Sequence, residues 1–337
     1  MRAGKAQTFK DTPVFFLLFL MLLCACLASI ALGSVPISLP DLLGVLSGRI
    51  REGTEYTLIW QIRIPRTLAC LGAGLGLSSS GLILQNVMNN ALASPNTIGV
   101  NSGAGFAVML SMVFFPTAIE VRGPFAFIGA LVTALLIFGL AYLTDSSRIT
   151  VILAGITVSA FLGAGMSLIK ILDSDLLINI NTFLVGSLSA MTYSQIAIPL
   201  VMITIAFLIT ALLSNGLNIL SLGDDIASGL GMNVSRIRLI FLILASLLAG
   251  TVISYAGLIS FVGLIVPHIA RKIFANDNRL LLPASGLLGA VYVLLCDLLG
   301  RTLIAPYELP AGIIMSFIGG PFFLYLLLRK KGGRRLG

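Results

Sequence analysis

Long, almost uncharged apolar runs follow one another along most of this 337-residue chain, and they limit what it can fold into more than any other feature. An apolar helix of about 20 residues spans the hydrocarbon core of a bilayer, which is roughly 30 Å thick. Backbone polar groups must pair internally there, and a β-barrel would show short alternating segments instead. Charged residues make up 10% of the chain, against about a quarter in soluble domains. The sequence therefore predicts an all-α membrane protein.

Ten runs are apolar enough to be transmembrane helices, although the eighth is short. Glycine and other small residues are dense in several of them, which lets helices approach closely inside a bundle. We therefore expect one transmembrane domain over residues 1–337, with short tails at 1–12 and 329–337. The predicted spans are 14–33, 67–85, 97–115, 124–143, 149–169, 195–214, 237–255, 257–268, 280–299 and 311–328.

The distribution of Lys and Arg predicts the orientation of the chain. An even number of spans leaves both termini on one side, and a cytoplasmic placement puts about two-thirds of the 21 Lys and Arg residues in inner segments. The formal net charge of +8 is then mainly an orientation signal, not a nucleic-acid surface. The run 14–33 is longer than the apolar core of a signal peptide, which favours an uncleaved first span. We expect a multi-pass protein with cytoplasmic termini.

Several function classes lack the residues that they require. No G-x-x-x-x-G-K-[ST] motif is present, so the chain has no P-loop for ATP. Ion-coupled carriers place ionisable groups at membrane depth, but here Asp297, His268 and Arg301 lie at or near span ends. The four cysteines lie in spans and are predicted to be buried apolar residues, not disulfide partners or metal ligands. We expect a pore or carrier that is not an enzyme, binds no cofactor or metal, and draws its energy from elsewhere.

Two polar segments flank the second predicted span. Gln61 to Arg66 (QIRIPR) lies at its outer end, where two arginines could present a positive patch or simply extend to the membrane interface. Asn89 to Gly99 (NNALASPNTIG) lies at its inner end. Pro95 ends any helix there, and asparagine side chains can hold a turn. A plain connecting turn is the favoured interpretation of this second segment.

The segment Asn218 to Arg238 is long for an inner loop between two spans. Asp224 and Asp225 are typical of the start of a short helix, here predicted at about 225–230. Gly231 is typical of a helix end. Such a helix on the cytoplasmic face could dock a soluble partner, or it could be a lid without one.

Two apolar segments carry weaker signals. The stretch 176–191 is apolar enough to be a short helix at the outer interface. The stretch 257–271 (GLISFVGLIVPHIAR) ends its apolar run at Pro267 and His268. A lone histidine is more often structural than a metal ligand, so we predict a structural role for His268.

The motifs together resemble the FecCD-type permeases of ABC importers for iron-siderophore complexes, haem and cobalamin. Each motif is weak alone, but their order and spacing over residues 57–328 are highly specific. They are QIRIPR from Gln61, GLILQ from Gly81, ALASP from Ala91, GVNSGAG from Gly99, LSLGD from Leu220, GLISFVGLIVPH from Gly257, Leu282-Pro283, DLLGR from Asp297, LPAG from Leu309 and GGPFF from Gly319.

This resemblance implies a BtuC-like type II importer fold of ten transmembrane helices in the bacterial cell membrane. It also implies the partners: a second permease subunit, two cytoplasmic ATP-binding subunits and an extracytoplasmic substrate-binding protein, with no nucleic acid. The translocation path would lie between the two permease subunits. ATP hydrolysis would reside on the partner subunits, and their closure would drive alternating access through the 217–238 loop.

The resemblance also implies roles for individual residues. Those matching binding-protein docking positions are Arg63, Arg66 and Arg301; those matching the ATPase coupling loop are Gly223, Asp224, Asp225, Ala227, Gly229 and Gly231; those matching gate elements are Asn90, Leu92, Ser146 and Ser147. One departure concerns the gate, because the family usually reads N-P-L-A where this chain has Ala91 after Asn90. A lost proline frees a backbone N–H and relaxes the turn.

A ferric siderophore is the expected cargo, with haem and cobalamin as alternatives within the same class. A nearly uncharged pathway suits a bulky chelate that must pass without binding tightly. Two other classes make different predictions. An ion-coupled secondary transporter would work on a gradient without an ATPase, and a membrane-embedded enzyme would need converging polar groups at membrane depth.

Overall fold

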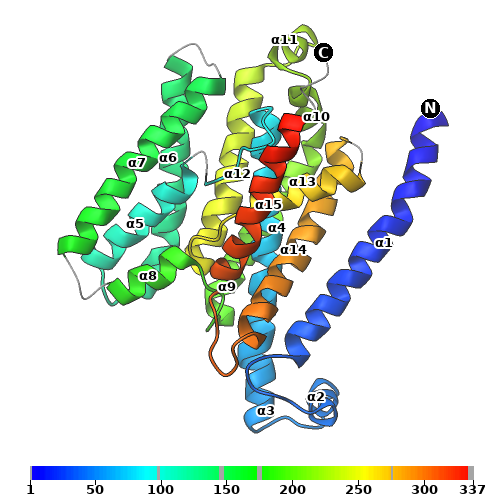
Figure 1. Ribbon diagram of the computed structural model, residues 1–337, viewed down its shortest axis with the longest axis vertical. Coiled ribbons are helices and arrows are strands. Elements are labelled where there is room, and N and C mark those ends of the chain that lie inside the picture. Colours follow the sequence, from blue (N-terminus) through cyan, green and yellow to red (C-terminus); the bar gives the residue numbers. More distant parts are fainter. Residues whose placement is uncertain (1, 97–98, 144–147, 173–176, 275, 333–337) are drawn as a thin grey trace.

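Helices form every regular element in the part of the chain that the computed structural model describes, which is residues 2–96, 99–143, 148–172, 177–274 and 276–332 (Figure 1). They are α1 (Arg2–Ala31), α2 (Leu39–Leu46), α3 (Thr54–Thr57), the π-helix η1 (Leu58–Arg63), α4 (Ile64–Val87), α5 (Val100–Phe114), the 3-10 helix η2 (Ile119–Val121), α6 (Arg122–Leu143), α7 (Arg148–Leu172), α8 (Leu177–Val185), α9 (Tyr193–Leu212), α10 (Ser214–Ser221), α11 (Asp224–Gly229), α12 (Val234–Ala256), α13 (Val262–Ile273), α14 (Asn278–Thr302) and α15 (Ala311–Gly332).

Each of the ten predicted spans corresponds to one helix, so the expected all-α membrane protein is confirmed. These helices are α1, α4, α5, α6, α7, α9, α12, α13, α14 and α15. Within the described residues, six helical stretches are long and apolar enough to cross a bilayer, and three more are apolar over shorter lengths. The short helix expected near 176–191 is α8, which ends at Val185 because Gly186 adopts a positive φ of 77°.

The eighth predicted span, 257–268, is displaced in the structure and is a correction. Residues 257–260 are not helical, and α13 begins only at Val262. Gly257 ends α12 with φ 73°, where an added Cβ would overlap the backbone of Phe183 in α8. The Leu258 N–H donates to the Phe183 carbonyl at 2.9 Å. The apolar run therefore contains a backbone break, at which the Leu258 N–H pairs with α8 instead of with the preceding helical turn.

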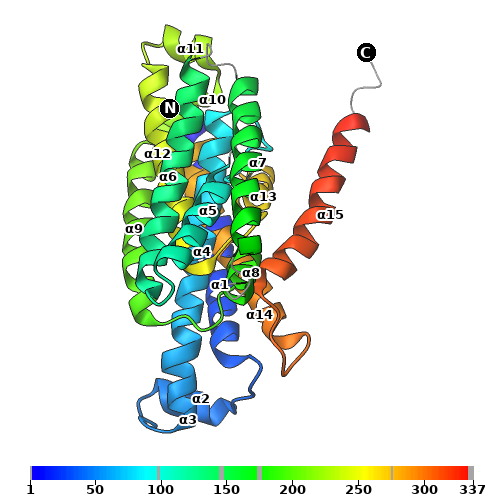
Figure 2. The ribbon, with the colours of Figure 1, turned by 90° about the vertical axis from the view of Figure 1, so that its left-hand side faces the viewer.

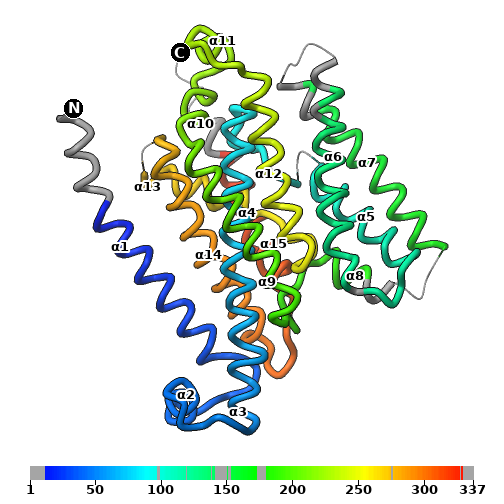
Figure 3. The backbone as a smooth tube through the Cα atoms, turned by 180° about the vertical axis from the view of Figure 1, so that it is seen from behind, coloured from blue at the N-terminus to red at the C-terminus, as the bar shows by residue number. Residues whose placement is uncertain are grey.

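Helix α4 is the centre of the bundle and packs mainly on α14 and α12 (Figure 3). Its close approaches need glycine: a Cβ on Gly74 would overlap the Gly289 backbone in α14, and a Cβ on Gly81 would overlap Gly263 in α13. Helices α5, α6, α7 and α8 form a second group that joins the first through the contact of α6 with α12 (Figure 1). Small-residue packing thus replaces the hydrophobic driving force that lipid removes.

The two ends of the bundle differ in what they carry. Helix α11 lies at one end, and the first turns of α1 and the last turns of α15 point the same way (Figures 1 and 2). Helices α2 and α3 lie at the opposite end. A continuous helical stretch from α3 through α4 covers 34 residues, or about 50 Å, and so extends beyond the hydrocarbon core. We call the α11 end the inner end and the α2–α3 end the outer end, following the predicted orientation.

Candidate functional site

The outer QIRIPR segment lies where a π-helix passes into α4. Pro65 has no N–H, and in an α-helix its ring would clash with the carbonyl four residues earlier. The wider π turn of η1, which ends at Arg63, accommodates this position. As a result Arg63 and Arg66 both point into the protein, and each is less than 5% exposed.

Arg66 forms a buried ion-pair network with residues of α14 and the loop after it. Its Nη2 lies 2.9 Å from Oδ1 of Asp297, and its Nη1 lies 2.6 Å from Oε2 of Glu308. Arg301 Nε lies 3.1 Å from the other oxygen of Asp297, one helical turn away on α14. Asp297 is 1% exposed and Arg301 is 2% exposed. One carboxylate therefore bridges two guanidinium groups in a site that water hardly reaches.

Arg63 binds the end of α1. Its Nη1 donates to the carbonyls of Ile30 and Ala31, both at 2.7 Å, and its Nη2 donates to the Val35 carbonyl. The carbonyls of Ile30 and Ala31 are the last two of α1, which carry partial negative charge and lack partners within the helix, and Val35 lies in the segment that follows. Arg63 thus caps α1 and fixes it against α4.

We call Arg63, Arg66, Asp297, Arg301 and Glu308 the arginine cluster. Burial by itself raises the pKa of Glu308, but the hydrogen bond and charge of Arg66, the Ser34 hydroxyl and the charge of Arg301 together lower that pKa below its ordinary value. The cluster contains one more cation than anions, and its cations are directed toward α1, α14 and the 303–310 loop. The structure therefore brings the three predicted docking arginines together, but inside the protein instead of on its surface.

The predicted inner helix forms as α11, from Asp224 to Gly229. Gly223 precedes it with φ 108°, and Gly231 follows it with φ 81°. The Met232 N–H donates to the Ala227 carbonyl at 3.1 Å, and the Gly231 N–H donates to the Ser228 carbonyl at 2.9 Å. These two hydrogen bonds, around a glycine in the left-handed backbone conformation, form a Schellman motif. Two glycines thus delimit a single short helix at the inner end.

Residues on one face of α11 contact the bundle, and residues on the other face are exposed. Asp224 Oδ1 lies 2.7 Å from Arg238 Nη2 of α12, and Ala227 is completely buried. Opposite them, Leu222, Ile226 and Leu230 are 55%, 53% and 64% exposed. Ile226 lies in α11, Leu222 directly precedes Gly223, and Leu230 follows the last residue of the helix; we call these three exposed residues the α11 stripe. Asp225 and Gly229 are also exposed.

The predicted gate residues are only partly described. The Leu92 N–H donates to Asn90 Oδ1 at 3.0 Å, and the Asn90 N–H donates to the Gln85 carbonyl at 3.0 Å. The asparagine side chain thus holds the turn that contains Ala91. Asn90 and Leu92 are half-buried at the inner end of α4. Ser146 and Ser147 lie outside the described residues.

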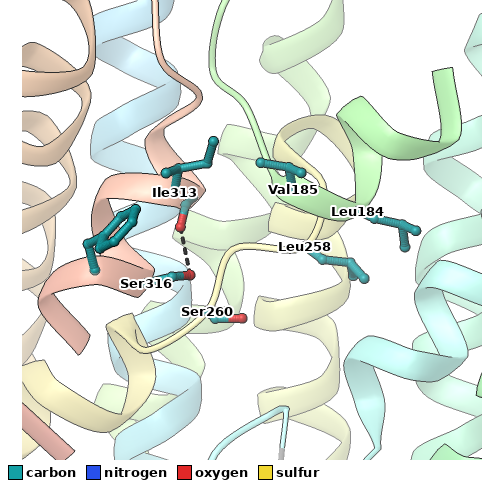
Figure 4. Close-up of a pocket in the computed structure, with 8 residues that line it drawn as sticks. Leu184, Val185, Leu258, Ser260, Ile313 and Ser316 are labelled. Carbon is teal, nitrogen blue, oxygen red and sulfur yellow. Dashed lines mark hydrogen bonds between the residues drawn. The ribbon is translucent and has the colours of Figure 1, made fainter. Parts of the chain in front are cut away.

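An open pocket of about 390 Å³ lies between α8, the 257–261 segment and α15 (Figure 4). Its lining is apolar apart from two hydroxyls, Ser260 and Ser316. The Ser316 hydroxyl donates to the Gly312 carbonyl at 2.8 Å, so its polar group is largely satisfied within α15 (Figure 4). No charged side chain is among the lining residues. The pocket is suited to an uncharged or charge-shielded surface.

Histidine and cysteine provide no obvious metal site. The His268 ring packs edge-on against Phe322 of α15 with centroids 6.0 Å apart. In the described ranges, no group of three or more His, Cys, Asp or Glu side chains is placed to hold a metal ion.

Sequence reasoning missed the acidic half of the arginine cluster. Asp297 and Arg301 are four apart on one helix, which is an ion-pair spacing, and this signal was available in the DLLGR motif. Glu308 had no such signal, because it reaches Arg66 across 242 residues of sequence.

Comparison with known proteins gives concordant results. Residues 20–329 match the sequence model of the FecCD transport family. The Fe(3+)-citrate import system permease protein YfmE of Bacillus subtilis (strain 168) is 36% identical over 321 residues, covering 94% of this chain and 96% of that protein. The hemin transport system permease protein HmuU of Yersinia pestis is 36% identical over 283 residues, covering 82% and 85%. A solved inward-facing conformation of a metal-chelate type ABC transporter matches with a TM-score of 0.84 and 29% identity, covering 94% and 99%.

Proposed function

Because the chain belongs to the FecCD transport family and is a permease of the ABC importer class, we propose that it moves a ferric siderophore across the bacterial cell membrane. The family match over residues 20–329 is the observation that carries this proposal. Similarity to the ferric-citrate permease supports iron in chelated form as the cargo. Similarity to the hemin permease makes haem the second candidate.

Energy for transport comes from ATPase subunits that dock at α11. Membership of the family implies an associated ATPase, and we propose two copies of it. The α11 stripe supports this location, because it exposes three large apolar side chains at the inner end. An apolar face presented to water, unlike one presented to lipid, marks a surface for a protein partner. The salt bridge between Asp224 and Arg238 would carry motion of α11 into α12.

A substrate-binding protein docks at the outer end in this proposal. The docking role predicted for Arg63, Arg66 and Arg301 takes an indirect form, because their side chains are buried. The arginine cluster holds α1, α4 and the 303–310 loop in fixed positions, and the exposed loop residues meet the partner. Tyr307 is 77% exposed and directly precedes Glu308.

The cargo passes along the side of the bundle formed by α7, α8 and α15, where a second permease subunit completes the path. The open apolar pocket beside α8 and α15 supports this side (Figure 4). A surface without charge offers no strong site for an anionic or cationic chelate. A low-affinity pathway of this kind allows the cargo to leave as readily as it enters.

Reconstitution tests the proposal. The chain is co-expressed with the ATPase, binding protein and any second permease encoded beside it, and the complex is placed in proteoliposomes. We expect ATP-dependent uptake of a ferric siderophore when its binding protein is present. Uptake of haem or cobalamin instead would change the cargo. Uptake driven by a proton or sodium gradient without the ATPase would contradict the mechanism.

A further inference from the structure

A cluster of neutral amides at the inner end joins three helices that are distant in sequence. Asn86 is in the last turn of α4, Asn218 is in α10, and Asn278 is the first residue of α14. Asn278 is 1% exposed and Asn86 is 7% exposed. We call these three residues the amide cluster.

The hydrogen bonds of the amide cluster form a continuous chain. Oδ1 of Asn218 accepts from both the backbone N–H and Nδ2 of Asn278, at 2.8 and 2.9 Å. Oδ1 of Asn278 accepts from Nδ2 of Asn86 at 2.9 Å. The Nδ2 of Asn218 donates to Oδ1 of Asp277 at 2.8 Å. Asp277 in turn caps α14 by accepting from the Arg279 N–H at 3.0 Å.

Helix α10 is therefore attached by its polar side to helices other than its neighbours in sequence. It packs on α4 and α14 more than on α9, which precedes it, or on α12. Only Leu222 and Gly223 separate α10 from α11. A displacement of α11 reaches α10 directly along the chain.

The far end of the amide cluster leads to the turn after α4. The carbonyl of Asn86 accepts from the Asn89 N–H at 3.1 Å, and the next turn residue, Asn90, binds the Gln85 carbonyl. The inner end of α4, the amide cluster and the 89–92 turn thus share hydrogen bonds. A shift at Asn218 has a short polar path to the segment that contains Asn90 and Leu92.

We propose that Asn218, Asn278 and Asn86 are positioning residues that transmit motion from α11 to the inner ends of α4 and α14. This is a second route, separate from the contact of Asp224 with Arg238 on α12. The inference rests on the proposed function, since it needs an ATPase at α11. Amides suit a linkage that has to move, because they exchange hydrogen-bond partners without leaving a buried charge.

A polarity swap tests the proposal in the complete importer in proteoliposomes. Asn218→Asp keeps an oxygen that accepts from the donors of Asn278, but it replaces the hydrogen bond to Asp277 with repulsion between two carboxylates, which pushes α10 away from the start of α14. Asp277→Asn alone keeps an oxygen for Asn218 to bind and remains an adequate helix cap, so it is the matched control. In the double variant N218D/D277N the new amide donates to the new carboxylate, and the link is restored with reversed direction.

We expect N218D to lower the amount of cargo moved per ATP hydrolysed by about tenfold, while basal ATP hydrolysis and subunit assembly stay at the level of the unmodified complex. D277N and the double variant are expected to transport with the efficiency of the unmodified complex. Asn218→Ala, which removes the hydrogen bonds without adding a charge, is expected to uncouple in the same way.

Two results would overturn the inference: unchanged coupling in N218D and N218A, or failure of both to assemble, which would make the cluster a purely structural element. The unmodified complex separates this outcome from failure of the proposed function. If it transports with ATP while the variants do not uncouple, only the amide route is wrong. If it does not transport with ATP at all, the proposed function itself is wrong.

Discussion

The outer and inner ends of this protein fasten their helices with different chemistry. At the outer end, the arginine cluster joins α4 and α14 through ion pairs whose central carboxylate, Asp297, is 1% exposed, and it holds α1 through hydrogen bonds to the carbonyls of Ile30 and Ala31. At the inner end, the amide cluster holds α4, α10 and α14 through hydrogen bonds between neutral side chains. Both clusters join helices distant in sequence, but only the outer one is charged.

This difference in chemistry indicates which end stays fixed during transport. Separating a buried ion pair leaves a charge without a partner in a low dielectric, and removing one partner costs about 3–5 kcal/mol. A buried amide that loses its partner costs about 1–3 kcal/mol. We therefore expect the outer end to be rigid and the inner end to rearrange during transport. The location of α11 at the inner end agrees with this division.

The largest expected effect comes from removing the central carboxylate of the outer end. Asp297→Asn leaves Arg66 and Arg301 buried with one fewer anion between them. We expect the free energy of unfolding in mixed micelles to fall by about 3–5 kcal/mol. The control, Asp225→Asn on exposed α11, should change it by less than about 0.5 kcal/mol. Equal stability of the two variants would mean that the arginine cluster does not hold the outer end.

Placing a charge on the α11 stripe tests whether the inner end presents a surface to a partner. Ile226→Asp should leave the permease folded, because this side chain is 53% exposed. Binding of the ATPase, followed by pull-down or by interferometry, should weaken by about thirtyfold, as for an interface hot spot. Ser228→Asp adds the same charge elsewhere on α11 and should bind as the unmodified chain does. Equal binding by both variants would remove the stripe from the interface.

The loss in free energy of unfolding when the amide cluster is broken can be compared directly with the loss when the arginine cluster is broken. Asn278→Leu keeps a side chain branched at Cγ but leaves the polar groups of Asn86 and Asn218 without their partner. We expect a loss of about 1–3 kcal/mol in the free energy of unfolding, which is smaller than for Asp297→Asn. Asn215→Ala, at the exposed edge of α10, serves as the control. A loss in Asn278→Leu as large as that in Asp297→Asn would erase the proposed difference between the ends.

Acid tests the outer end separately, because the pKa of Glu308, which lies outside the spans, is shifted. The pKa of Glu308 is lowered in the folded protein from an ordinary value of 4.5. Its contribution to stability is therefore complete above that ordinary value and is lost as pH falls through the lowered one. We expect the stability advantage of the unmodified chain over Glu308→Gln to be constant near neutral pH and to shrink in acid.

Thermal unfolding of both proteins in detergent at a series of pH values measures this effect. It is expected to be the smallest of the four, because Glu308 is only partly buried and exposed ion pairs contribute little. An advantage that grows on acidification would have the wrong sign for a carboxylate with a lowered pKa.

The helices were largely predictable from sequence because lipid imposes a simple rule on them. A span must be long, apolar and hydrogen-bonded within itself, so runs such as 14–33 and 237–255 can be read directly. The rule fails where backbone is paired with another element. Residues 257–260 are as apolar as a span, yet the Leu258 N–H binds the Phe183 carbonyl of α8. Nothing local in the sequence distinguishes that case from a helix.

The site was predictable only where one segment contains the whole signal. The caps of α11 follow from Asp224 and Gly231, because acidic residues and glycine have local reasons to be at helix ends. The burial of Arg66 depends instead on Glu308, 242 positions away. A sequence pattern places an arginine near a membrane surface but does not say which carboxylate meets it. The amide cluster was not predicted, because three isolated asparagines carry no spacing signal.

Transport by the purified chain, with and without its ATPase, tests the central claim most directly. The account predicts no uphill accumulation of a ferric siderophore in proteoliposomes that contain the permease alone, whatever ion gradient is imposed. Accumulation should begin when ATPase, ATP and loaded binding protein are all supplied. Robust uphill uptake by the lone permease under a proton or sodium gradient would contradict it.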